Sequence, residues 1–129
     1  MTKAEAMRNF WNSFGVPAYE ENSLPTGIPF PYITYQLVED SFGNEVAMSA
    51  NIWDKDSDGH SALKTVSIKA DEISEYIGRG GVLLPVNGGK IWVKSGSPFA
   101  QTLADEDRTV KRKYLNIAVE YFTANYLVF

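Results

Sequence analysis

The segment from Arg112 to Thr123 constrains the fold of this chain more than any other feature. Its apolar side is made by Leu115, Ile117, Val119 and Tyr121, and the intervening positions are Tyr114, Asn116, Ala118 and Glu120. A period of two residues places these two sets on opposite faces of an extended strand. The pattern therefore predicts a long strand with one face in a core, and such a strand needs other strands beside it.

Further segments provide those neighbours. The two-residue alternation returns at 32–38 and 45–53, which we expect to pair as a hairpin through residues 40–44. A second hairpin is predicted from 82–86 and 90–94, because Asn87-Gly88-Gly89 between them is typical of a tight turn. A weaker strand at 98–103 is predicted to pair with the last strand. The strands thus make up most of the chain.

Two helices complete the predicted elements. Thr2 and Glu5 have the spacing of a capping box, and the helix that follows is expected at 3–14, before Gly15. A second, long helix is predicted to end at Gly78, and its apolar stripe is Leu63, Val66, Ala70, Ile73 and Ile77. Between the first helix and the first strand, prolines at 25, 29 and 31 exclude regular structure.

The order of these elements predicts the fold class. A helix, two strands, a second helix and then three or four strands indicate an α+β fold, with a mainly antiparallel sheet on which the N-terminal helix and the long central helix pack. The chain has 129 residues, of which 44% are hydrophobic, so one domain covering residues 1–129 can bury a core.

Charge and cysteine content exclude several functional classes. With 12 basic and 16 acidic residues the net charge is −4, which does not fit a protein that grips duplex DNA. The absence of cysteine excludes disulfides and thiolate metal sites. No stretch approaches the ~20 apolar residues of a membrane span, and the first residues do not resemble a signal peptide. We therefore expect a soluble protein that acts without export and has no membrane partner.

One local motif suggests a metal ion. Asp54, Asp56, Asp58 and Gly59 reproduce the first half of a calcium-binding loop. The second half fails, because Thr65 stands where such a loop has its bidentate glutamate. The three aspartates are therefore a minor candidate for a divalent-cation site. The favoured interpretation is an exposed acidic turn in which Asp58 or Ser61 caps the following helix.

His60 is the only histidine, and it stands next to Ser61. A nucleophile and its base would need to face each other, whereas adjacent residues at the start of a helix point in different directions. A solvated loop position for His60 is favoured. The glycines at 78–81 and 88–89 are read as a helix end and a hairpin turn, since neither cluster completes a nucleotide-binding motif.

A block of opposite charges precedes the last strand. Asp105, Glu106 and Asp107 are followed by Arg108, Lys111, Arg112 and Lys113. Such a block is either a solvated hairpin tip or a self-complementary contact between identical subunits arranged in a ring. Two apolar stretches, 23–31 and 125–129, either contact a partner or belong to the domain itself, the first as a loop packed over the core and the second as an extension of the last strand. The residues alone leave both alternatives open.

Several of these segments together resemble the tail terminator, or tail completion, proteins of long-tailed bacteriophages and prophages. The resemblance lies in the entry into the first strand at 29–35, the strand end at 51–53 with its acidic turn, the loop at 107–108 and the closing strand at 112–123. It implies an α+β protein of the virion, without enzymatic activity or cofactor. Its expected partners are further copies in a hexameric ring, the tail-tube protein and the head connector protein.

The resemblance identifies no contact residues, so the contacts of such a ring are predicted from the sequence itself. Six copies would carry −24, six times the −4 of one chain, so a channel lined by carboxylates would let DNA pass without specific binding. The predicted subunit interface is Asp105, Glu106, Asp107, Arg108 and Lys111. The predicted ring-face or partner contacts are Pro25, Ile28, Phe30, Asp54 and Asp56. The alternatives are another head-tail joining protein or a tail-tube subunit and, in a different class, a small divalent-metal-dependent enzyme or calcium-binding module.

Overall fold

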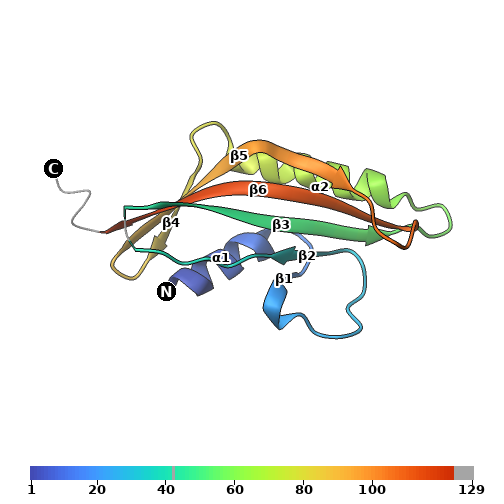
Figure 1. The fold of residues 1–129 in the computed structure, drawn as a ribbon, viewed down its shortest axis with the longest axis horizontal. Helices are drawn as coiled ribbons and strands as arrows, with labels where there is room; N and C mark the ends of the chain where they lie inside the picture. The colour runs from blue at the N-terminus through green and yellow to red at the C-terminus, as the bar shows by residue number, and fades with distance from the viewer. Residues whose placement is uncertain (42, 124–129) are drawn as a thin grey trace.

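The structure is a computed structural model that describes residues 1–41 and 43–123. Figure 1 shows a curled sheet with two helices. The elements are α1 (Lys3–Trp11), β1 (Ala18–Glu20), β2 (Tyr32–Tyr35), β3 (Glu45–Lys55), α2 (Ala62–Ile77), β4 (Val82–Val86), β5 (Gly89–Leu103) and β6 (Val110–Thr123), with short 3-10 helices at Asn12–Phe14 and Glu21–Ser23. The mixed α+β class predicted from the sequence is confirmed.

The sheet has the strand order β1-β2-β3-β6-β5-β4. β1 runs parallel to β2, and the other four neighbouring pairs are antiparallel. β3 and β6 pair along their length, from Glu45 opposite Glu120 to Lys55 opposite Val110. The weaker strand predicted at 98–103 is the end of β5, which continues past an irregularity between Ser95 and Ala100 and pairs with β6.

The helices begin where the sequence predicts and differ in their detail. The capping box is confirmed, because the Thr2 hydroxyl accepts from the Glu5 N–H and the Glu5 carboxylate accepts from the Thr2 N–H. α2 has 16 residues, and Ser61 caps it by accepting from the Lys64 N–H at 3.3 Å. The placement of Leu63 in the core is wrong, since Leu63 is 44% exposed and Ala62 takes the buried position.

Both helices contribute to a single core. α2 packs against β3, β5 and β6, whereas α1 contacts β1 and β4, the two outermost strands of the sheet. A helix can touch both outermost strands only because the sheet curls around it (Figure 1). Trp11 of α1 is 1% exposed and stacks on Tyr35 of β2, with 6.2 Å between ring centroids. The core therefore depends on α1 as well as on the long strands.

Two further expectations from the sequence concern membrane spans and the C-terminal apolar stretch. Among the described residues, no helix is long and apolar enough to cross a membrane. The apolar stretch predicted at 125–129, with its alternatives of a partner contact or an extended last strand, lies outside the described residues.

Candidate functional site

One end of the molecule gathers most of the residues that the sequence marks as functional. We call it the loop end and define it as residues 25–31, 54–61 and 104–111. In Figure 1 it lies at the right, where β3 and β6 turn, opposite the end at which β6 stops. The antiparallel pairing of β3 with β6 explains this arrangement, because it places Lys55 beside Val110. Segments far apart in the sequence thus meet at one end of the sheet.

Hydrogen bonds and ion pairs hold two of these loops together. The Asp56 N–H donates to the Thr109 carbonyl at 2.7 Å. Lys111 Nζ lies 3.9 Å from the Asp56 carboxylate, and Lys55 Nζ lies 3.8 Å from the Asp107 carboxylate. The acidic turn after β3 and the loop before β6 therefore form one joined surface.

Asp54 is not at that surface. Only 2% of the residue is exposed, and its carboxylate lies 2.6 Å from His60 Nε2 and accepts from the Lys55 N–H at 2.8 Å. β3 continues through residue 55, so its alternation places Asp54 on the same inward face as Ile52 and Ala50. The structure therefore does not support the predicted partner contact of Asp54, because its side chain is buried against its own loop.

The same geometry does not support the minor candidate for a divalent-cation site. Asp54 points inward to His60, the Asp56 carboxylate accepts from the Ala62 N–H at 2.8 Å, and Asp58 is exposed. Within residues 1–41 and 43–123, no three His, Cys, Asp or Glu side chains converge as a metal site would require. The motif has the spacing of a calcium loop, but its carboxylates serve the backbone and the histidine. Of the two predicted helix caps, Ser61 is the one the structure confirms.

His60 lies in the predicted loop, yet it is held in place. Its side chain is 44% exposed, and its Nε2 atom contacts Asp54 at 2.6 Å and the Thr65 hydroxyl at 3.4 Å. A catalytic relay needs the carboxylate on one ring nitrogen and the nucleophile on the other. Because Asp54 and Thr65 share one nitrogen, these three residues anchor the loop and do not form a relay.

This anchoring leads to a stability prediction. In the variant His60→Ala the buried Asp54 carboxylate loses its side-chain partner, which should lower the free energy of unfolding by about 1–3 kcal/mol. The exposed Asp58 is a matched control in the same loop, and Asp58→Ala should change stability by less than about 0.5 kcal/mol. Urea denaturation monitored by circular dichroism measures both. Equal effects of the two variants would contradict an anchoring role for His60.

The five predicted interface residues divide into two groups. Asp107 accepts from the Thr109 N–H at 2.9 Å and hydroxyl at 2.6 Å, and these hydrogen bonds hold the pKa of Asp107 below its usual value. Lys111 is likewise engaged, with Asp56 and with the Arg108 carbonyl. Both side chains thus shape the loop itself.

The second group is Asp105, Glu106 and Arg108. All three are exposed, and no ion pair joins any of them to another residue in the described part of the chain. Asp105 and Arg108 line a hollow of about 380 Å³, whose apolar lining includes Leu63, Leu103 and Val110. This combination of unengaged charges and apolar surface suits contact with another molecule.

A row of aromatic rings, which the sequence analysis missed, joins the proline-rich segment to this loop. The ring centroids of Phe30 and Tyr32 lie 5.3 Å apart, those of Tyr32 and Trp53 lie 6.3 Å apart, and the Arg112 guanidinium sits 5.1 Å from the Trp53 centroid. The register explains the row, because Tyr32 is opposite Trp53 and Trp53 is opposite Arg112. The two-residue alternation within β2, β3 and β6 could have indicated that Tyr32, Trp53 and Arg112 share the outward face of the sheet.

Asp105 lies close enough to influence this row. Burial raises the pKa of Tyr32, and the negative charge of Asp105 raises it further. Of the predicted ring-face residues, Pro25 and Phe30 are exposed, Phe30 by 37%, and Ile28 is half-buried. Phe30 therefore belongs to the same end of the molecule as the charged loop.

No protein-family model matches this chain, and a search of curated protein sequences finds no match either.

Proposed function

We propose that this chain is a tail terminator protein of a long-tailed bacteriophage or prophage. In this proposal it has no enzymatic role, forms a ring at the head-proximal end of the tail tube, stops polymerisation of the tube and joins the tail to the head connector. The sequence resemblance is the basis of the proposal. The observation that supports it best is the loop end, where exposed Asp105 and Arg108 line a largely apolar hollow and Glu106 is exposed between them in sequence.

The chemistry of that end suits a ring of identical subunits. A head-to-tail contact brings two different patches together and closes when the rotation between subunits allows it. In the proposed contact the acidic residues of one copy face Arg108 of the next, and the apolar hollow supplies area that loses contact with water. Charges in such a contact set register and partner choice more than affinity. The net charge of −4 per chain is compatible with a channel through which DNA passes.

Charge reversal tests this contact. Arg108→Glu should place like charges across the interface. We expect the fraction of protein in the oligomer to fall at least several-fold, as measured by sedimentation velocity at moderate salt. Arg79→Glu is the matched control, because Arg79 is an exposed arginine in the turn after α2, outside the loop end. Combining Arg108→Glu with Glu106→Arg should restore assembly, since the exchanged charges remain complementary.

Arg108 is the better target than Asp107, because reversing Asp107 would also disrupt its hydrogen bonds to Thr109. Equal oligomer mass for wild type, Arg108→Glu and Arg79→Glu would contradict the proposed contact.

Electron microscopy of the purified protein distinguishes a terminator from a tail-tube subunit. Single rings are expected of a terminator, whereas long tubes would indicate a tail-tube subunit.

A further inference from the structure

Part of β5 forms an open edge of the sheet. β4 pairs with β5 only from Gly89 to Val93, so the stretch from Ser95 to Leu103 has β6 on one side and, in the described part of the chain, no strand on the other. Figure 1 shows β5 at the upper margin of the sheet with α2 beside it. An unpaired strand edge presents main-chain N–H and C=O groups that can pair with another strand.

Alternation along the strands shows which main-chain groups of β5 point outward. The Thr109 carbonyl accepts from the Asp56 N–H beyond the end of β3, so the even-numbered residues of β6 direct their main-chain groups toward β5. Gln101 is opposite one of these and points back to β6, whereas Ala100 and Thr102 point away from the sheet. No hydrogen bond joins the outward main-chain groups of Ala100 and Thr102 to another described residue.

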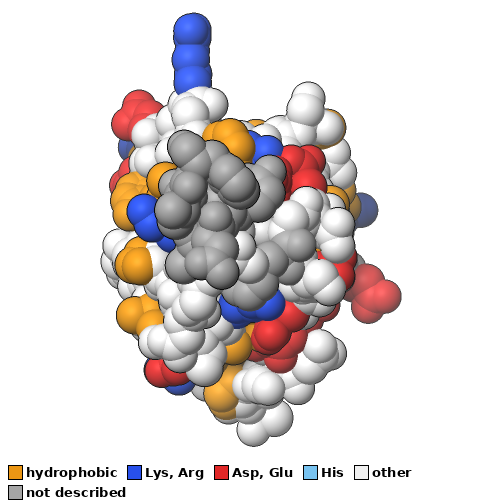
Figure 2. Space-filling view, turned by 90° about the vertical axis from the view of Figure 1, so that its left-hand side faces the viewer, with side chains coloured by type: hydrophobic (Ala, Val, Ile, Leu, Met, Phe, Trp, Pro, Cys, Tyr) orange, Lys and Arg blue, Asp and Glu red, His pale blue; other side chains and the backbone are white. Residues whose placement is uncertain are grey.

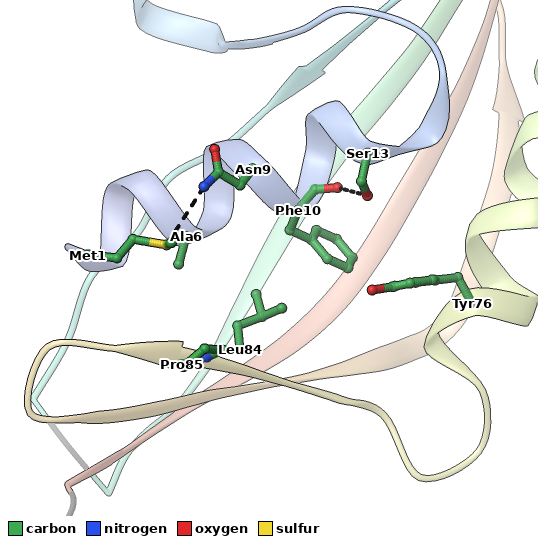
Figure 3. A pocket seen from close by; sticks show the side chains of 8 residues that line it. All are labelled: Met1, Ala6, Asn9, Phe10, Ser13, Tyr76, Leu84 and Pro85. Carbon is green, nitrogen blue, oxygen red and sulfur yellow. Dashed lines mark hydrogen bonds between the residues drawn. The ribbon is translucent and has the colours of Figure 1, made fainter.

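The remaining edges of the sheet, at β1 and β4, are protected. At β1 the Asn12 side chain accepts from the Ala18 N–H at 3.0 Å and donates to the Ala18 carbonyl at 3.2 Å. At β4, Pro85 has no N–H to offer, and the Asn87 N–H donates to the Met1 carbonyl at 2.8 Å. Figure 3 shows α1 lying alongside this strand. Sheets commonly protect their edges in such ways, which makes the open edge of β5 the place for a partner.

The open edge also lacks the charges that keep strand edges apart. Charged side chains are spread over the end of the molecule in Figure 2, whereas β5 carries none from Ser95 to Leu103. Pro98 interrupts only the first part of this stretch, because regular pairing with β6 resumes at Ala100. Residues 99–103 therefore fit an extended polypeptide, whose own main-chain groups would satisfy those that point outward.

Self-complementarity selects a second copy of this chain as that polypeptide. When two copies of the edge run antiparallel with Gln101 opposite Gln101, Ala100 of each copy is opposite Thr102 of the other. Each of these pairs then exchanges two N–H···O bonds. The acidic residues at 105–106 fall opposite uncharged residues 96–97, so no like charges meet.

Other antiparallel registers satisfy fewer main-chain groups. Centring the pair on Ala100 would place Thr102 opposite Pro98, which has no N–H. Centring it on Thr102 would place Ala100 opposite Ala104, which lies beyond the end of β5. The register centred on Gln101 is therefore favoured.

We propose that β5 pairs with β5 of a second copy across a two-fold axis at Gln101, which joins two six-stranded sheets into one. Leu63 of α2, which is 44% exposed and lines the same hollow as Leu103, supplies apolar surface at this edge. The inference goes beyond the proposed ring and does not depend on it, because Asp105, Glu106 and Arg108 lie outside the pairing.

Engineered cysteines test this register, because the chain has none of its own. Gln101 is exposed, and the two Cα atoms of residue 101 would lie about 4.5 Å apart, within the range that a disulfide allows. Under mild oxidation, Gln101→Cys should give a disulfide-linked dimer. Ser95→Cys is the matched control, since Ser95 is exposed on the same strand and its two copies would lie roughly 30 Å or more apart. We expect the control to link at least tenfold more slowly.

Non-reducing gels separate the outcomes. A dimer from Gln101→Cys that forms at least tenfold faster than one from Ser95→Cys supports the proposal. Similar rates for the two variants would overturn it, and so would a Gln101→Cys protein that stays monomeric, which would leave the edge to a strand of a different protein.

Charge at the two-fold axis provides a second measurement without cysteines. Gln101→Lys places two like charges opposite each other and should lower the dimer fraction in sedimentation velocity several-fold, whereas Gln101→Thr should retain it. An unchanged dimer fraction in Gln101→Lys would overturn the proposal.

The two proposed contacts between copies can also be told apart. Arg108→Glu, which tests the ring, should leave the cross-link of Gln101→Cys unchanged. Loss of that cross-link in the combined variant would assign it to the ring contact and overturn the two-fold pairing.

Discussion

Replacing Trp11 with alanine should lower the free energy of unfolding by about 3–5 kcal/mol, the largest effect expected of any single substitution considered for this protein. Trp11 is 1% exposed, its ring meets that of Phe10 edge-on at 4.9 Å, and it stacks on Tyr35. Its helix contacts both outermost strands, so the cavity would open between α1 and the curled sheet.

Urea denaturation followed by circular dichroism measures this loss. Because a loss of this size is a large part of the 5–15 kcal/mol that stabilises a typical domain, Trp11→Phe serves as a milder variant that should still fold. Phe30→Ala is the matched control, since Phe30 is an aromatic residue with 37% exposure and should cost about 1 kcal/mol or less. If Trp11→Ala cost no more than Phe30→Ala, α1 would not be an integral part of the core.

Alkaline pH should destabilise the protein through Tyr121. Burial, followed by the nearby charges of Glu39 and Asp40, raises the pKa of Tyr121 to about 12. An unfolded tyrosine loses its proton near pH 10, so between about pH 10 and pH 12 the unfolded state binds fewer protons than the folded state. The free energy of unfolding is therefore unaffected below pH 10 and falls as pH rises to 12, by on the order of 3 kcal/mol in total.

The variant Tyr121→Phe isolates this contribution. It removes the hydrogen bond from the Tyr121 hydroxyl to the Val38 carbonyl, at 2.7 Å, and should lower stability by about 1 kcal/mol at pH 8. Its stability should then fall less steeply between pH 9 and pH 11 than that of the wild type. Tyr76→Phe is the matched control at an exposed tyrosine. Urea midpoints at each pH provide the measurement, and parallel pH profiles for wild type and Tyr121→Phe would contradict the assignment.

Local patterns were sufficient to predict most elements of this fold. The capping box at Thr2 and Glu5, the strand alternation of β6 and the turn at Asn87 act through neighbouring residues, so they can be read from a short window of sequence. The misplacement of Leu63 shows the limit of such reading. An apolar residue one position from the true stripe satisfies a helical pattern nearly as well as Ala62 does.

The candidate site was harder to predict from the sequence than the helices and strands were. The alternation of Met48, Ala50 and Ile52 extends by two residues to Asp54, which could have indicated that this carboxylate is buried. Its partnership with His60 required the loop geometry, because a backbone turn brings the two side chains together. The sequence also marked all five charged interface candidates alike, whereas only the folded loop shows that Asp107 and Lys111 are engaged within the chain.

By itself, the sequence determined a cysteine-free acidic chain, its two helices, its strands other than β1, and the α+β class, because composition and periodicity are properties of the chain and its immediate neighbours. Only the tertiary structure decided the strand order, the curl that lets α1 touch both outermost strands, and the row from Phe30 to Arg112. Those features arise where residues distant in sequence meet, and the pairing register of β3 with β6 sets which of them do.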